Sequence, residues 1–151
     1  MRPFALDPFR LMTMGKRWME DSMAAFLCHG VFSRFPDLRV ASIENGGNWV
    51  VPFLDHLTEV HRKMPQGFAE DPVVAFKRNV SVSPFHEDDI GALIDAIGVD
   101  RVLFGSDYPH PEGLAEPRSY IDHLPAGLSD EDFAKIMGGN LSHIMRVPVP
   151  A

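Results

Sequence analysis

Carboxylates, imidazoles and an amide follow three apolar segments of the chain, each at the point where a strand is expected to end. Glu44 and Asn45 follow the first segment, His86 follows the second, and Asp107 and His110 follow the third. Because the carboxyl ends of parallel strands meet at one edge of a sheet, we expect these side chains to share one rim. Carboxylates and neutral imidazoles bind divalent metals that activate water, and they also act as general acids and bases. The pattern therefore predicts a metal site or an acid–base site at this rim.

Most of these candidates also have a purely structural interpretation. Asp107 can be a solvated turn residue that bonds its own backbone. His86 stands just before an acidic helix start, where surface and capping residues are common. The prolines on either side of His110 fix its direction without indicating whether it faces a pocket. Glu44 is harder to explain structurally, because a carboxylate that leaves a buried strand needs a partner or solvent.

Other chemistry-bearing residues give weaker signals. Cys28 falls within an apolar helical period, where we expect a packed thiol rather than a nucleophile. Gly46 and Gly47 precede a helix and could cradle an anion, but two glycines alone are not a specific motif. Ser106 lacks the G-x-S-x-G spacing of a hydrolase nucleophile. The carboxylates and imidazoles of the rim remain the main candidates.

The elements expected to position these residues alternate between helix and strand. Asp7 followed by Pro8 predicts a helix start, and apolar residues at spacings of three and four extend this helix to about Arg34. Ser129 with Asp132 matches a capping box, while glycines are placed to end helices at positions 98 and 138. The alternation predicts an α/β fold with a parallel sheet and right-handed crossovers. Strands are expected at 38–43, 79–83 and 101–107, and further helices at 49–60, 86–98, 115–124 and 129–140.

Length, charge and cysteine content limit the possible functions. We treat residues 1–151 as a single domain, with residues 1–25 as a helix leading into it. The chain has 14 basic and 21 acidic residues and a formal net charge of −7, which argues against a nucleic-acid partner. A single cysteine rules out an intrachain disulfide and favours a reducing, cytoplasmic compartment. Charges interrupt every apolar run, so we expect neither a signal peptide nor a membrane span.

Three stretches make the chain resemble a known enzyme family. They are "GVFSRFPDLRVASIENGGNWVVPFLDHL", "NVSVSPFHEDDI" and "IGVDRVLFGSDYPHPEG". They are similar to the carboxyl-terminal half of the metal-dependent amidohydrolase superfamily, in the branch typified by aminocarboxymuconate semialdehyde decarboxylase. The resemblance runs from about Phe26 to Arg146. It implies a (β/α)8 barrel whose metal is held by an H-x-H pair on the first strand, a further histidine, and an aspartate on the last strand.

The resemblance assigns roles to the rim residues. Asp107 falls on the metal-binding aspartate, which also handles the proton of the attacking water or substrate. Glu44 stands where many relatives have an acid–base histidine, so the resemblance implies that it moves a proton or orients the substrate. Asn45, His86 and His110 would line the substrate pocket. The implied cofactor is zinc or manganese, and the implied activity is hydrolysis or decarboxylation of a small organic acid or cyclic substrate.

The chain departs from this family in length and in its metal motif. A complete barrel needs about 250 residues, so this chain has room only for strands six to eight and their helices. It contains no H-x-H, and Asp107 alone cannot hold zinc, which needs three or four protein ligands.

Two hypotheses follow from this departure. In the first, the chain is enzymatic, and His86, His110 or another polypeptide supplies the missing ligands. In the second, the chain is a catalytically inactive, truncated half-barrel. Because an open barrel leaves two strand edges unpaired, such a chain would associate with itself or with an amino-terminal partner.

Overall fold

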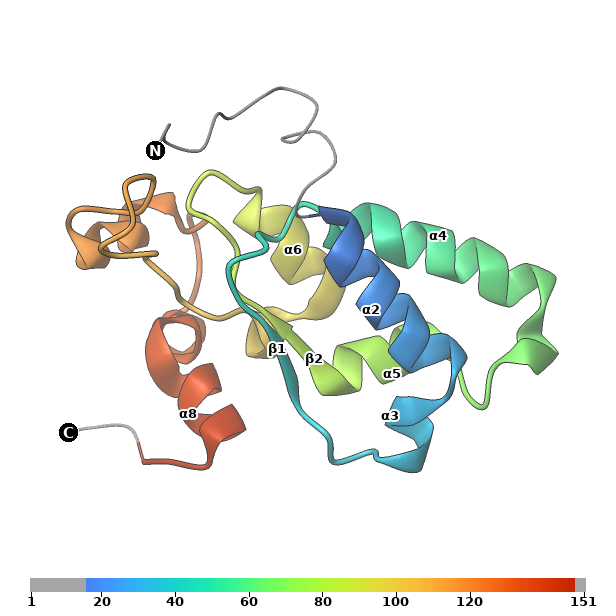
Figure 1. Ribbon diagram of the computed structural model, residues 1–151. Helices are drawn as coiled ribbons and strands as arrows, with labels where there is room; N and C mark the ends of the chain where they lie inside the picture. The colour runs from blue at the N-terminus through green and yellow to red at the C-terminus, as the bar shows by residue number, and fades with distance from the viewer. Residues whose placement is uncertain (1–15, 149–151) are drawn as a thin grey trace, which may run out of the picture.

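The computed structural model describes residues 16–148, which form an α/β fold rich in helix (Figure 1). The first half contains α2 (Lys16–Cys28), α3 (Val31–Arg34), β1 (Val40–Ser42), α4 (Val50–Lys63), the 3-10 turn η1 (Pro65–Gly67), α5 (Pro72–Asn79) and β2 (Val80–Val82). The second half contains α6 (Ile90–Ile97), the 3-10 helices η2 (Val99–Arg101) and η3 (Pro117–His123), α7 (Asp130–Ala134), the π-helical turn η4 (Lys135–Gly139) and α8 (Asn140–Met145).

The two strands form a parallel sheet, as the sequence predicts. Val40 of β1 lies opposite Val80 of β2, and Ser42 lies opposite Val82. All three residues of β2 are buried, which is usual for a parallel strand covered on both faces. In Figure 1, helices α2, α4, α5 and α6 lie on one side of the strands and α8 lies on the other.

The third expected strand, at 101–107, is reduced to a single bridge. Val102 pairs with Val82 in the parallel sense, and the N–H of Leu103 donates to the carbonyl of Val82 at 2.8 Å. The next N–H, that of Phe104, donates instead to the carbonyl of Ile136 in η4 at 3.1 Å. The pairing of this segment with β2 ends at Phe104, because the Phe104 N–H bonds to η4 instead of to the strand.

The core lies between the strands and the helices. Trp49 and Phe76 are almost fully buried, and their rings meet edge to face with centroids 6.0 Å apart. Such aromatic pairs contribute stability beyond the area that they bury. Other fully buried side chains belong to Met23, Phe32, Val50, Val80, Val82, Ile90, Leu93, Leu103, Tyr120 and Ile136.

The expected long amino-terminal helix is interrupted. Helix α2 ends at Cys28, Gly30 adopts a left-handed conformation with φ of 63°, and α3 begins at Val31. Glycine takes this conformation without the steric cost of a Cβ atom, so the apolar period continues while the helix does not. Cys28 is exposed, and the prediction of a packed thiol is therefore wrong. The predicted cap at Asp7 lies outside the described residues.

Helix α5 is missing from the sequence-based prediction, although its start carries a clear signal. The Oδ1 atom of Asp71 accepts hydrogen bonds from the N–H groups of Val73 (2.8 Å) and Val74 (3.2 Å), and Pro72 occupies the first turn. The aspartate–proline pair is the same signature that predicts a helix at Asp7.

The later helices differ from expectation at their ends. Helix α6 begins at Ile90 rather than at 86, because Asp89 caps it by accepting from the N–H of Ala92, and it ends at Gly98 as expected. The segment expected to be a helix at 115–124 forms the 3-10 helix Pro117–His123 instead. Ser129 accepts from the N–H of Asp132, as a capping residue should. At position 138 the glycine has non-helical backbone angles, but it kinks the chain rather than ending it, since α8 follows.

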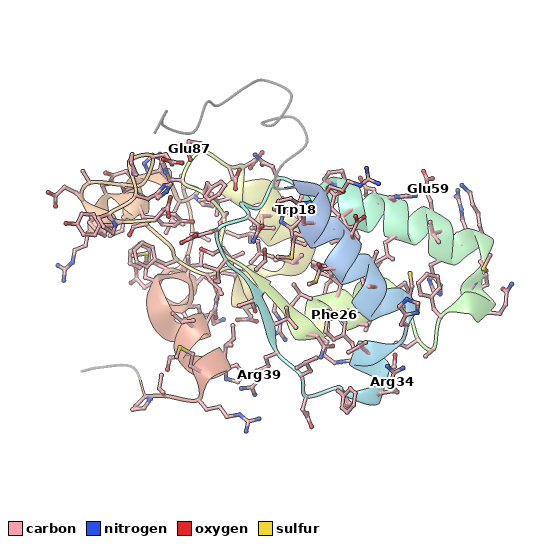
Figure 2. The ribbon with its side chains drawn as sticks, viewed as in Figure 1. Trp18, Phe26, Arg34, Arg39, Glu59 and Glu87 are labelled. Carbon is pink, nitrogen blue, oxygen red and sulfur yellow. The ribbon has the colours of Figure 1, made fainter. Side chains whose placement is uncertain are left out.

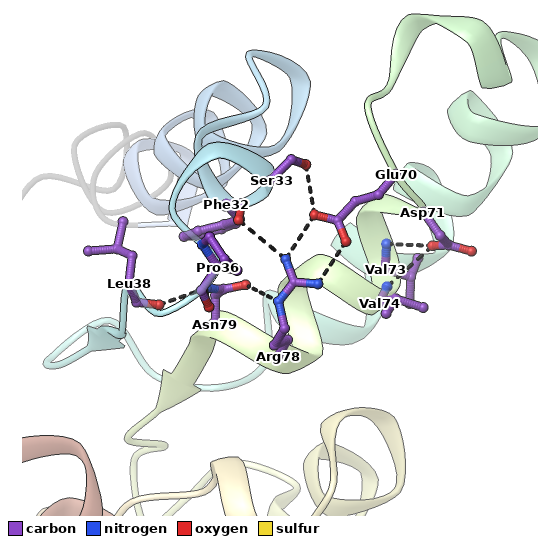
Figure 3. A network of polar contacts seen from close by, with 10 residues as sticks. All are labelled: Phe32, Ser33, Pro36, Leu38, Glu70, Asp71, Val73, Val74, Arg78 and Asn79. Atoms are coloured by element: carbon purple, nitrogen blue, oxygen red, sulfur yellow. Dashed lines mark hydrogen bonds and ion pairs between the residues drawn. The ribbon is translucent and has the colours of Figure 1, made fainter.

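Polar contacts tie α3 to α5, and the segment before β1 to α8. The guanidinium of Arg78 bonds both carboxylate oxygens of Glu70 at 2.7 and 2.8 Å, and the hydroxyl of Ser33 also donates to Glu70 (Figure 3). Arg39, labelled in Figure 2, precedes β1 and donates to the carbonyl of His143 in α8 at 2.8 Å.

Within residues 16–148, no helix combines the length and apolar character needed to span a bilayer.

Candidate functional site

A pocket of about 350 Å³ opens where the chain leaves β1, β2 and the Val102 bridge. This volume is within the range of small-molecule sites, which begins at about 300 Å³. The pocket brings together Glu44, His86 and the Asp107–His110 turn, which come from three segments far apart in the sequence. Its full lining consists of Glu44, Phe85, His86, Glu87, Gly105, Ser106, Asp107, His110 and Glu112.

Glu44 and Asp107 share an unusual backbone conformation. Their φ angles are 57° and 56°, in the left-handed region that non-glycine residues seldom adopt. Within the described part of the chain, the other non-glycine residue with positive φ is Arg146, which ends α8 in the ordinary way for a helix C-terminus. Strained backbone of this kind gathers at functional sites, where the surrounding structure holds it in place.

The loop after the third segment turns Asp107 toward the pocket. The N–H of His110 donates to the Asp107 carbonyl, and the N–H of Leu114 donates to the Ser106 carbonyl, both at 2.8 Å. Gly113 lies against this turn so closely that a Cβ atom there would be 2.6 Å from the carbonyl carbon of Asp107. The side chain of Asp107 is 22% exposed, and its Oδ2 atom lies 3.5 Å from Nδ1 of His110.

His86 approaches the pocket from the loop after β2. Its side chain is 21% exposed, and its Nδ1 atom lies 3.2 Å from Oε2 of Glu87. The His86 ring also packs edge to face against the ring of His123, with centroids 4.9 Å apart. Figure 2 shows Glu87 at the outer edge of this loop. His86 is therefore a partly buried residue of the pocket lining, and the Glu87 carboxylate lies beside its Nδ1 atom.

Asn45 lies near the pocket but does not line it. Its side-chain amide donates to the carbonyl of Ile43 at 2.6 Å and so caps the turn that follows β1. The sequence-based assignment of Asn45 to substrate binding remains a prediction.

The pocket carries a concentration of negative charge. Glu44, Glu87, Asp107 and Glu112 all line it, and the described lining contains no lysine or arginine. The imidazole of His110 lies between two of these carboxylates, with Nδ1 at 3.0 Å from Oε2 of Glu112. A cleft of one charge sign concentrates counter-ions, so this pocket favours cations.

The described pocket residues do not by themselves supply enough ligands for a divalent metal. In the 16–148 region, no group of three or more histidine, cysteine, aspartate or glutamate side chains converges closely enough to hold an ion. Structural and catalytic zinc sites use three or four protein ligands. The described residues therefore do not form a complete metal centre by themselves, and Asp107 is at most one ligand of such a centre.

The structure adds two residues that sequence reasoning did not select, Gly113 and Asp88. Gly113 is required by the tight turn described above. Asp88 accepts hydrogen bonds from the N–H groups of Gly47 (2.6 Å) and Phe85 (2.8 Å). The sequence does contain a hint of the role of Asp88. Three acidic residues, Glu87 to Asp89, precede α6, and a helix needs only one of them as its N-cap.

Comparisons with known proteins bear on the family and the fold of the chain. A family model described as amidohydrolase matches residues 20–140. The structure is similar to that of amidohydrolase map2389c from Mycobacterium avium subsp. paratuberculosis K-10, with a TM-score of 0.87 and 42% identity, covering 93% of this chain and 36% of that one.

A second similar structure is the 5-carboxyvanillate decarboxylase LigW from Sphingomonas paucimobilis. The TM-score is 0.66 at 24% identity, and the match covers 84% of this chain and 39% of that one. This second likeness supports the fold. The chain thus spans little more than a third of the length of the two proteins that it resembles.

Proposed function

Because this chain belongs to the amidohydrolase family, we propose that it forms part of a metal-dependent hydrolase or decarboxylase acting on a small organic acid or cyclic substrate. The observation that carries this proposal is the convergence of Glu44 and Asp107 on one pocket, each with left-handed backbone. The family generally uses a divalent metal. The name of the 42% identical relative, an amidohydrolase, supports hydrolysis.

In this proposal the pocket residues have distinct roles. Asp107 contributes one carboxylate ligand to zinc or manganese, and His110, 3.5 Å away, orients that carboxylate. Glu44 lies exposed at the pocket mouth, where it transfers a proton or orients the substrate. His86 and His110 line the substrate side of the pocket, and Asn45 contacts only the outer part of a substrate.

The charge of the pocket constrains how an organic acid would bind. Four carboxylates line the described pocket and repel a carboxylated substrate. An anionic substrate therefore needs a compensating cation, which a bound divalent metal or residues beyond this pocket would supply. This requirement supports a metal-dependent enzyme over a metal-free one.

We further propose that the chain corresponds to strands six to eight of a (β/α)8 barrel and that another polypeptide segment completes the site. The extent of the structural match supports this proposal, because the match covers 36% of the mycobacterial relative. In the described structure β1 pairs only with β2, so its other edge has no strand partner. That edge is where an amino-terminal half-barrel, or a second copy of this chain, would add a strand.

The alternative is an inactive half-barrel that serves only in association. It is favoured by the lack of a three-ligand cluster within residues 16–148. The two proposals differ in one property, which is whether the pocket acquires a metal once its other half is supplied.

A complementation experiment separates the two proposals. This chain is co-expressed with the part of the mycobacterial amidohydrolase that it does not match, and the chain alone and any co-purified complex are analysed for metal and for hydrolase and decarboxylase turnover. Stoichiometric zinc or manganese in the complex supports the enzyme. Metal-free protein without turnover, both alone and in the complex, contradicts the enzyme and supports the inactive half-barrel.

A further inference from the structure

The loops that follow β1 and β2 meet at one carboxylate. The Oδ2 atom of Asp88 accepts from the N–H of Gly47, in the loop after β1, at 2.6 Å. The same oxygen accepts from the N–H of Phe85, in the loop after β2, at 2.8 Å. Hydrogen bonds to an ionised carboxylate are about twice as strong as neutral ones. One oxygen atom thus joins two loops that are about forty residues apart in the sequence.

The two glycines allow this close approach. A Cβ atom on Gly46 would lie 2.9 Å from the ring of Phe85 and 3.0 Å from Oδ2 of Asp88, and one on Gly47 would lie 3.1 Å from Cβ of Pro84. These distances are shorter than side-chain contacts normally tolerate. The Gly47 N–H thus binds an anionic group, the Asp88 carboxylate of the neighbouring loop, and Gly46 leaves room for it.

Asp88 is not needed to cap the adjacent helix. Asp89 caps α6 by accepting from the N–H of Ala92 at 2.9 Å. Both side-chain bonds of Asp88 go instead to loop amides that lie beyond the helix. Its role is therefore to join loops rather than to start α6.

Tyr120 of η3 also holds the loop after β2. Tyr120 is fully buried, its hydroxyl reaches the carbonyl of Pro84 at 3.5 Å, and its ring packs against Phe104. Burial, together with the charge of Asp88, raises the pKa of Tyr120 above its ordinary value, and the protonated phenol donates to the Pro84 carbonyl. The bond from Tyr120 to Pro84 and the bond from Phe85 to Asp88 together restrict the movement of this loop.

We propose that Asp88 is a positioning residue that fixes the loop carrying Glu44 against the loop carrying His86. Glu44 lies three residues before Gly47, and His86 lies two residues before Asp88. We call the two hydrogen bonds from Gly47 and Phe85 to Asp88 the loop joint. Glu44 and His86 both lie within a few residues of this joint, and both line the same pocket. This inference rests on the proposed function for its catalytic meaning, while the joint itself can be measured without a substrate.

The test compares Asp88→Ala and Asp88→Asn in the 151-residue protein by nuclear magnetic resonance. Asparagine retains one oxygen that can accept both N–H bonds, whereas alanine retains none. In Asp88→Ala we expect the Gly47 amide to exchange about ten to a hundredfold faster. We also expect the contact between Gly46 and the Phe85 ring to disappear, and the Glu44 and His86 signals to shift. Asp88→Asn should restore the contact and the signal positions and recover part of the exchange protection, because its neutral oxygen accepts the same two bonds more weakly.

A matched control is Asp71→Ala, which also removes one carboxylate oxygen that accepts two backbone N–H bonds, but at α5. It should leave the Gly47, Glu44 and His86 signals unchanged. The proposal is overturned if the Gly47 amide of the unaltered protein exchanges as fast as an exposed loop amide. It is equally overturned if asparagine fails to rescue, or if the control reproduces the effect. Since none of these readouts uses metal or turnover, a failure of the proposed function would be seen separately.

Discussion

The Nδ1 atom of His110 lies 3.5 Å from Oδ2 of Asp107, and the backbone N–H of His110 donates to the carbonyl of that same residue. The tight turn therefore holds the backbone of Asp107 and places the His110 imidazole beside its carboxylate. Its left-handed φ of 56° is held in place by this turn. The geometry explains how an aspartate that follows an apolar segment is directed into a pocket instead of into solvent.

Replacing Gly113 should displace this turn. In Gly113→Ala the new Cβ atom would overlap the Asp107 backbone, with 2.6 Å to its carbonyl carbon. We expect a loss of about 1–3 kcal/mol in the free energy of unfolding, measured by urea denaturation. Gly91→Ala in α6 is the control, because its Cβ atom has only ordinary contacts. It should be neutral or stabilising by up to about 1 kcal/mol. Equal stability of the two variants would show that the turn tolerates a Cβ atom.

The Glu70–Arg78 pair should make stability depend on acid pH. Hydrogen bonds from Arg78 and Ser33 lower the pKa of Glu70 from 4.5 to about 2. A lowered pKa in the folded state means that the stabilisation is fully present above pH 4.5 and is lost as the pH falls toward 2. Glu70→Gln should cost about 1–2 kcal/mol at neutral pH and reduce the slope of stability against pH in that window.

The control for this prediction is Glu59→Gln. Glu59 forms an exposed pair with Lys63 at 3.7 Å on α4, and such pairs contribute little. Its melting temperature should follow that of the unaltered protein from neutral to acid pH. If Glu70→Gln behaves in the same way, the Arg78 contact does not stabilise the fold.

The unpaired edge of β1 should promote association of the chain when it is alone. Ile43 directly follows β1 and is 49% exposed, and exposed strand edges pair with other chains. Ile43→Lys should lower the oligomeric mass measured by light scattering, because charge at an edge discourages pairing. Met64→Lys alters a residue of similar exposure, 55%, that lies beyond α4, and should leave the mass unchanged. A monodisperse monomer that melts cooperatively would contradict the predicted association.

Sequence reasoning succeeded where periodicity and strand ends carry the information. The parallel pairing of β1 with β2 and the end of α6 at Gly98 are both confirmed. Four of the five rim residues converge on one pocket because parallel strands place their carboxyl ends together. This part of the structure follows from local pattern and from the topology that alternating helices and strands impose.

The errors have physical causes. The break at Gly30 interrupts a helix whose apolar period continues, so periodicity alone does not reveal it. The third strand shortens because Phe104 bonds to Ile136, a contact set by tertiary structure. The left-handed backbone of Glu44 and the joint at Asp88 depend on neighbouring loops. No local pattern encodes those loops. Helix α5, by contrast, was predictable from Asp71 and its following proline.

The most direct test of the central claim is the metal content of the complemented complex when Asp107 is altered. Asp107→Asn removes the carboxylate charge at the pocket, and Asp71→Asn makes the same change at the start of α5, away from the pocket. We expect one zinc or manganese ion per complex in the unaltered protein and in Asp71→Asn, and a loss of at least about tenfold in metal affinity in Asp107→Asn. Equal metal content in all three would contradict Asp107 as a ligand, and its absence from all three would contradict a metal-dependent site.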